Sequence, residues 1–212
     1  MFVQTIRKSL WFGAVLAQSG LCFDARGATT ATSRVTVSVY NDANVPAEAV
    51  ASAEAAASRI FRHAGLEVKW IACAPSGDTS SNSPDCRQAA FPTHLHVRIL
   101  SQSRNLGGST LGISYLGADG IGCYSDIFFA PVAALHSSSG QEVGAILGYV
   151  MAHEIAHLLL GTNSHSVVGI MKARWQEEDL RSAKKGELLF TLAQSQTMRE
   201  RLASAGRQTV GD

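Results

Sequence analysis

The sequence HEIAHLLLGTNSH, at residues 153–165, begins within an almost entirely apolar stretch that runs from Val143 to Leu160. On a helix, His153 and His157 lie on one face, one turn apart, so both imidazoles can reach the same ion. Glu154 follows the first histidine directly. Buried on an apolar helix, each of these polar groups costs about 2 to 7 kcal/mol when it lacks a partner. A metal ion supplies that partner, and the stretch therefore predicts a metal site.

The residues that follow complete the coordination of a zinc ion. Gly161 stands where a helix must end for the chain to turn back, and glycine tolerates the positive φ of such an ending. His165 then offers a third imidazole, which leaves one tetrahedral position open, as in catalytic zinc sites. Met171 closes a Gly-Ile-Met sequence shortly afterwards. The predicted zinc ligands are His153, His157 and His165.

These residues resemble the motif of the metzincin clan of zinc metallopeptidases, H-E-x-x-H-x-x-G-x-x-H followed by a turn that contains methionine. The resemblance implies that Glu154 is the catalytic base and that Met171 supports the ligands from beneath the metal. The spacing differs, because the family's glycine would fall on Leu160 and its third histidine on Asn163. This chain has one extra residue before its glycine and one more before its third histidine. The specific resemblance covers about residues 140–175.

The resemblance implies a secreted zinc-dependent endopeptidase that acts on a peptide or protein substrate. Zinc-bound water would attack the peptide bond while Glu154 takes its proton and passes it to the leaving nitrogen. Two alternatives remain open. Glu177 could replace His165 as the third ligand, as in thermolysin-like zinc peptidases, although an acidic first turn of a helix also explains it. The protein could also be a non-catalytic secreted zinc-containing binding protein, in which the carboxylate of Glu154 would have no use.

The N-terminal segment has the composition of an export signal. Basic residues precede an apolar region at residues 10–23, and the sequence ARG at residues 25–27 forms a small-x-small cleavage site. The apolar region is shorter than the roughly 20 residues of a bilayer span. We therefore expect a signal peptide at residues 1–27, a single metalloprotease-like catalytic domain at residues 28–212 and no stable membrane span after cleavage. The mature protein would be secreted or periplasmic.

The charge balance argues against a nucleic-acid partner. The chain has 18 basic and 17 acidic residues, which give a formal net charge of +1. Such a balance creates no strong field that would attract a polyanion or an acidic membrane surface. The expected partner is therefore the peptide or protein substrate, and the composition leaves the oligomeric state open.

Two cysteines are expected to form a disulfide, which export permits. Cys73 and Cys86 flank a loop rich in Ser, Pro, Gly and Asp. In the chain-entropy model, closing a loop of this length stabilises the fold by about 3 kcal/mol. Cys123 is left over, either as a buried thiol or as a partner of one of the other two, and the spacing does not decide between these.

Periodicity divides the rest of the chain into strands and helices. Strands are expected at residues 35–40, 66–72, 95–100, 111–116 and 123–130. Helices are expected at residues 46–64, 140–160, 176–183 and 186–205. Together with the resemblance, this order predicts an α+β class: a mixed twisted β-sheet backed by helices around a central zinc-binding active-site helix, a metzincin-like zincin fold. In such a fold the strand at 111–116 is an edge that can pair with an extended peptide.

Three further residues have two interpretations each. His94 and His96 share one face of a strand, where they either bind a second metal or, as we expect, belong to a solvated surface. Trp175 follows the methionine turn, where related enzymes build the wall of a specificity pocket. Ordinary core packing explains this tryptophan equally well.

Overall fold

Five strands form one mixed sheet in the computed structural model, which describes residues 33–75 and 83–208. The strands are β1 (Ser33–Asn41), β2 (Leu66–Cys73), β3 (His94–Leu100), β4 (Gly112–Tyr115) and β5 (Tyr124–Phe128). Their order across the sheet is β2-β1-β3-β5-β4. Neighbours are parallel except β4, which is antiparallel to β5 and forms one edge. The fold is therefore of the mixed α+β class, and the predicted signal peptide lies outside the described residues.

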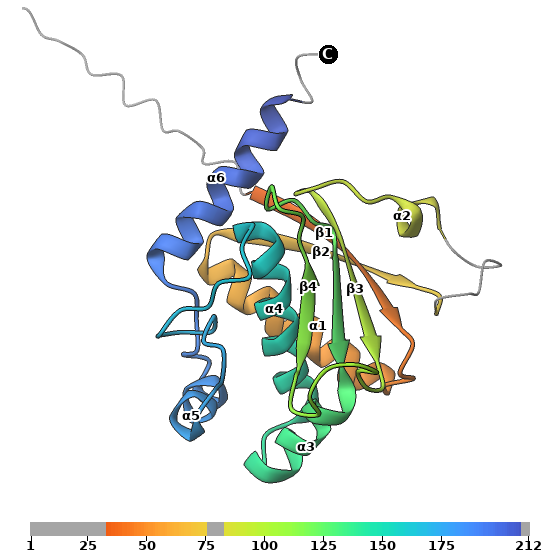
Figure 1. Ribbon diagram of the computed structural model, residues 1–212, viewed down its shortest axis with the longest axis vertical. Helices are drawn as coiled ribbons and strands as arrows, with labels where there is room; N and C mark the ends of the chain where they lie inside the picture. Colours follow the sequence, from red (N-terminus) through yellow and green to blue (C-terminus); the bar gives the residue numbers. More distant parts are fainter. Residues whose placement is uncertain (1–32, 76–82, 209–212) are drawn as a thin grey trace, which may run out of the picture. The chain divides into compact units, whose positions relative to one another are not determined.

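Two long helices cover one face of this sheet (Figure 1). They are α1 (Ala47–His63), which connects β1 to β2, and α4 (Val143–Leu160), which carries the HEIAH sequence. The remaining helices are α2 (Pro84–Arg87), α3 (Phe129–Ser139), α5 (Glu177–Lys185) and α6 (Leu192–Gln208). The core lies between the sheet and the two long helices, because every second residue of the central strands is buried and apolar, as in Val35, Val37, Val39, Leu95, Val97 and Ile99.

Glycines on α4 determine how closely it packs against α1. A Cβ atom added to Gly148 would lie 2.5 Å from the main-chain oxygen of Ala53, and one added to Gly144 would lie 2.7 Å from that of Ala49. Any larger residue at these positions would push the two helices apart. The position of α4, and with it the predicted metal site, therefore depends on small residues along this interface.

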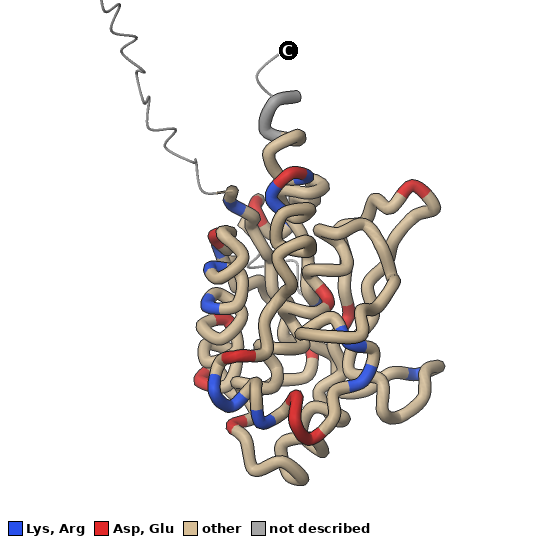
Figure 2. Tube along the Cα trace, turned by 90° about the vertical axis from the view of Figure 1, so that its left-hand side faces the viewer, with Lys and Arg blue, Asp and Glu red and all other residues tan. Residues whose placement is uncertain are grey.

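The helix α4 is, within the described part of the chain, the one helix long and apolar enough to cross a membrane. However, 83 % of it is buried inside the protein, as in the core helix of a globular domain. Figure 2 shows basic and acidic residues interspersed along the described chain rather than separated by sign.

Two predicted element boundaries are wrong. The strand predicted to run to residue 130 ends at Phe128, and a separate helix, α3, follows it before Gly140 ends that helix with a φ of 63°. Short apolar runs of this kind fit a strand or a buried helix equally well, which explains the error. The helix predicted from residue 186 begins instead at Leu192.

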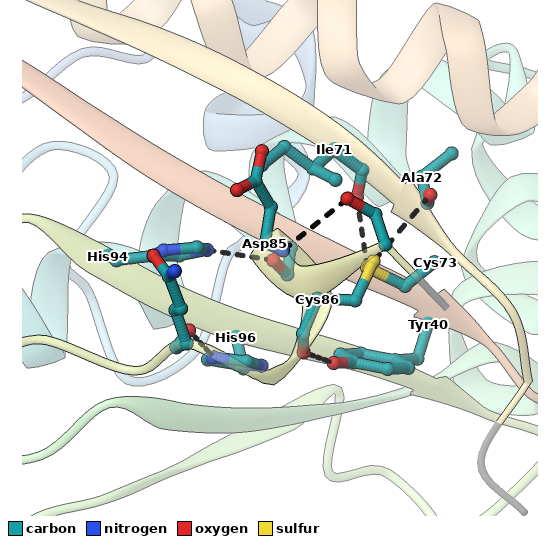
Figure 3. Close-up of a disulfide and its surroundings, with 11 residues drawn as sticks. Tyr40, Ile71, Ala72, Cys73, Asp85, Cys86, His94 and His96 are labelled. Carbon is teal, nitrogen blue, oxygen red and sulfur yellow. Dashed lines mark hydrogen bonds between the residues drawn. A yellow bond between two sulfur atoms is a disulfide. The ribbon is translucent and has the colours of Figure 1, made fainter. Parts of the chain in front are cut away.

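The other face of the sheet is crossed by the segment that carries α2. A disulfide joins Cys86 of this segment to Cys73 at the end of β2 (Figure 3). Under the segment, His94 Nε2 lies 2.9 Å from Ser38 Oγ, and His96 Nε2 donates to the main-chain oxygen of Gln88. Both histidines are buried, so the expectation of a solvated strand face is wrong.

Candidate metal centre

Three histidines meet at the C-terminal end of α4. His153 and His157 lie one turn apart on this helix, with exposures of 8 % and 4 %. The helix ends at Gly161, whose φ of 69° reverses the chain as the sequence predicts. His165 lies in the loop that follows and remains exposed. One ring nitrogen from each histidine lies within 4.8 Å of the other two. The structure thus brings the three predicted ligands together in a group that could hold a metal ion.

Main-chain carbonyl groups determine the tautomers of the two helical histidines. Nδ1 of His153 lies 2.8 Å from the oxygen of Ile170, and Nδ1 of His157 lies 2.7 Å from that of Thr162. Carbonyl oxygens only accept hydrogen bonds, so both Nδ1 atoms carry hydrogen and donate. Burial lowers the pKa of His153 to about 4 and also lowers that of His157. Both rings are therefore neutral at pH 7, with unprotonated Nε2 atoms.

These two unprotonated Nε2 atoms face each other at 3.0 Å. Neither can donate to the other, so two lone pairs meet in a buried site with no hydrogen between them. A cation between the rings would turn this repulsion into coordination, and neutral imidazole is a preferred zinc ligand. Carbonyl groups that hold the opposite ring nitrogen are also the usual outer partners of metal-binding histidines. The residues present thus fit a zinc ion.

The loop that carries His165 is tied back to the methionine turn. The main-chain N–H of Ser166 donates to the oxygen of Met171 at 2.8 Å. Ile170 contributes the carbonyl that holds His153, and the Trp175 indole N–H donates to the same oxygen at 3.0 Å. Ile170 and Met171 are both buried. The turn therefore holds one histidine directly. The position of Trp175 is explained by its hydrogen bond to Ile170 and by its packing against His153, with the two ring centroids 6.0 Å apart.

Glu154 points from α4 toward the inner face of β4. Its side chain is 5 % exposed, and Oε2 lies 2.7 Å from the hydroxyl of Ser114. Burial raises the pKa of this carboxyl group to about 7, although the hydrogen bond from Ser114 acts in the opposite direction. Ser114 is not among the site residues that the sequence predicts. The signal was present in the alternation of β4, which places Gly112 and Ser114 on one face, but the partner of that face is known only from the fold.

The alternative third ligand, Glu177, lies elsewhere. It stands in the first turn of α5, its side chain is 84 % exposed, and its Oε1 accepts from Arg181 Nη1 at 2.7 Å. Among the described residues, the candidate metal group contains the three histidines and no carboxylate. The structure therefore disfavours the thermolysin-like arrangement and leaves Glu177 as an acidic residue at a helix N-terminus.

The cysteines lie away from this centre. Cys73 and Cys86 form the disulfide that the sequence predicts, on the opposite face of the sheet from α4. Cys123 remains a free thiol, and burial raises its pKa. Beside the disulfide, a cavity of about 440 Å³ is lined by aromatic and charged side chains, among them Tyr40, His96, Arg98, Tyr124 and Asp126.

No family model matches the chain, and no curated protein matches it in sequence. The structure is similar to the crystal structure of a zinc-dependent peptidase from Methanocorpusculum labreanum (strain Z), with a TM-score of 0.50 and 11 % sequence identity. The similarity covers 76 % of this chain and 99 % of that chain. At this level of identity the similarity shows that the two proteins share a fold.

Proposed function

We propose that this protein is a zinc-dependent endopeptidase of the metzincin type, with His153, His157 and His165 as the metal ligands. The observation that carries the proposal is the pair of facing Nε2 atoms, unprotonated and buried, with a third imidazole within 4.8 Å. The buried Glu154 next to these ligands distinguishes the site from a structural zinc site, which needs no carboxylate of this kind. The fold shared with a zinc-dependent peptidase supports the same assignment.

In the proposed reaction, Glu154 moves a proton between water and the leaving group. A zinc ion at the three histidines would supply Lewis acidity, which activates water and polarises the scissile carbonyl group. Glu154 takes a proton from the water while the oxygen of that water bonds to the carbonyl carbon. The C–N bond then breaks, and the same carboxyl group returns the proton to the leaving nitrogen. The reaction consumes one water molecule for each peptide bond that is cleaved and produces one carboxyl group and one amino group.

The edge strand supports a peptide as the substrate. Within the sheet, β4 pairs with β5 on one side only. An extended peptide can add to such an edge through main-chain hydrogen bonds, which give affinity without strict sequence dependence. The inner face of β4 contacts Glu154, so a peptide at this edge would lie near the carboxyl group. This arrangement supports the prediction that the partner is a peptide or protein.

Export remains part of the proposal. It rests on residues 1–27, which lie outside the described residues, and is supported by the disulfide, because such bonds persist in oxidising compartments. Accordingly, we propose that the mature protein is secreted or periplasmic and has no membrane span after signal removal. N-terminal sequencing of the exported protein tests this, and an N-terminus at Met1 would contradict it.

The decisive experiment measures metal content and hydrolysis together. We expect the purified protein to hold about one zinc ion per chain, bound by the three histidines. We also expect it to cleave an unstructured protein such as casein. The Glu154→Gln variant should retain zinc and lose about 10² to 10⁴ in rate, because general-base assistance is lost. Full activity in the zinc-loaded variant would contradict the mechanism.

A second candidate function follows from the burial of Glu154, which is 5 % exposed beneath β4. If this cover excludes the substrate, the protein is a non-catalytic zinc-containing binding protein. A zinc-loaded protein that cleaves no member of a broad peptide library would favour this candidate over the peptidase.

A further inference from the structure

The inner face of β4 has a small residue where the strand crosses Glu154. Alternation along the strand directs Gly112 and Ser114 toward α4, whereas Ile113 and Tyr115 face the other way. A Cβ atom added to Gly112 would lie 2.6 Å from Cγ and 2.7 Å from Oε1 of Glu154. The carboxyl group therefore occupies a space that any side chain at this position would fill.

Ser114 makes direct contacts with Glu154 at the same place. Its Oγ lies 2.7 Å from Oε2 and 2.8 Å from the main-chain oxygen of Glu154. A hydroxyl group has one hydrogen to donate, and donation to a charged carboxylate is stronger than donation to a carbonyl oxygen. The Oγ of Ser125, on the neighbouring strand β5, lies 3.0 Å from Ser114 Oγ and can donate to it in turn. Both serines are buried.

These contacts give the two carboxyl oxygens of Glu154 different neighbours. Oε2 is held by the Ser114 hydroxyl, whereas Oε1 lies beside the main chain at Gly112. A glutamate has several rotatable bonds, and an unrestrained carboxylate would sample orientations that are unsuited to proton transfer. A hydrogen bond to one oxygen removes that freedom and leaves the other oxygen available.

The geometry points to Ser114 as the positioning residue for Glu154, holding Oε2 so that Oε1 can take the proton from the attacking water. This inference rests on the proposed function, in which Glu154 takes and returns that proton. Ser114 acts through Glu154 and takes no proton from the substrate. Ser125 supports it by donating to the Ser114 oxygen.

Two substitutions at Ser114 test the hydroxyl group. Ser114→Ala should retain zinc and lower kcat about 10-fold or more with an unchanged KM, because one charge-assisted hydrogen bond is lost. Ser114→Thr keeps the hydroxyl group and should recover most of kcat. The matched control is Ser38→Ala, which removes an equally buried serine hydroxyl on the opposite face of the sheet. This control should leave kcat unchanged.

A kcat of Ser114→Ala equal to that of the unmutated protein would overturn the assignment. An equal loss in the Ala and Thr variants would also overturn it, since packing alone would then be responsible. Crystal structures supply a readout apart from activity: in Ser114→Ala the Glu154 carboxyl group should turn away from β4. If the unmutated protein cleaves no peptide but the carboxyl group turns, the proposed function fails and the positioning contact stands. If the carboxyl group stays in place, the positioning role is wrong.

Discussion

At the scale of single residues, two carbonyl groups determine the tautomers of the helical histidines in the candidate metal centre. The oxygens of Thr162 and Ile170 each accept from Nδ1 of a buried histidine and so leave Nε2 of His153 and His157 unprotonated. Pre-set tautomers of this kind raise metal affinity, because no ring has to turn or lose a proton when the ion binds. The third imidazole, on His165, is exposed, and its ring centroid lies 5.4 Å from that of His153 and 4.9 Å from that of His157.

The proposed role of His165 as the third zinc ligand can be tested by substitution. His165→Ala should weaken zinc binding by more than about 100-fold, because loss of a ligand costs more than loss of an outer hydrogen-bonding partner. Glu177→Ala is the matched control and should not change zinc affinity, since this side chain pairs with Arg181 on the surface. Titration against a competing chelator measures both. If only Glu177→Ala loses zinc, the result would contradict His165 as the third ligand and favour the thermolysin-like alternative with Glu177.

At the scale of elements, the site depends on how closely α4 approaches its neighbours. On one side, glycines allow α4 to contact α1, and on the other, β4 lies over Glu154. His153, His157 and Glu154 are fixed to the same helix, so a displacement of α4 moves two of the candidate ligands and the carboxyl group together. Stability and activity are therefore expected to change together along this interface.

Gly148→Ala tests this interface. The new Cβ atom would lie 2.5 Å from the oxygen of Ala53 and should destabilise the fold by about 1 to 3 kcal/mol through overpacking. The melting temperature should fall by roughly 2 to 10 °C. Gly107→Ala is the control, because a Cβ atom at Gly107 meets nothing within 4 Å. If Gly148→Ala and the control have equal melting temperatures, the close approach of α1 and α4 at Gly148 does not contribute to the stability of the fold.

At the scale of the whole molecule, the two faces of the sheet are covered by different segments. One face packs against α4 and contains the candidate metal centre. The other holds His94 and His96 beneath a segment fastened by the disulfide between Cys73 and Cys86. Because no cysteine belongs to the candidate metal group, stability of the second face and metal binding at the first should respond to different treatments.

Reduction of the disulfide should separate these two properties. Replacing Cys73 and Cys86 with serine should cost about 3 kcal/mol of folding stability in the chain-entropy model, while zinc content stays unchanged. Cys123→Ser is the matched control, since this cysteine is a free thiol. Thermal melts and metal analysis on the same samples measure both effects. Loss of zinc on removing any cysteine would contradict the all-histidine site.

The buried histidines of the second face predict a pH dependence of stability. Burial lowers the pKa of His94 and of His96 below the ordinary value of 6.5. At a pH between the lowered value and 6.5, the unfolded chain binds more protons than the folded protein, so stability falls as pH falls. Denaturant unfolding of the zinc-loaded protein at pH 7.5 and at pH 5.5 measures this loss. The loss should shrink in a variant with glutamine at both positions, and an equal loss there would assign the effect to other groups.

Sequence alone was sufficient for the parts of the site that lie close together along the chain. Helical spacing predicted that His153 and His157 share a face, and Gly161 predicted the end of the helix, because both depend on local backbone geometry. The disulfide between Cys73 and Cys86 was predicted on the same basis, from two cysteines that flank one polar loop. The order and type of most strands also followed from local periodicity.

The tertiary structure decided what depends on contacts between distant segments. Ser114 and Glu154 are separated by 40 positions in sequence, so no local pattern indicates that one holds the other. The burial of His94 likewise requires the segment around α2 to cross the sheet, which alternation along one strand does not reveal. That His165, and not Glu177, lies beside His153 and His157 depends on where the loop after Gly161 and the first turn of α5 come to lie. Local periodicity determines which side of an element faces the core, whereas strand pairing and helix packing determine which residues meet there.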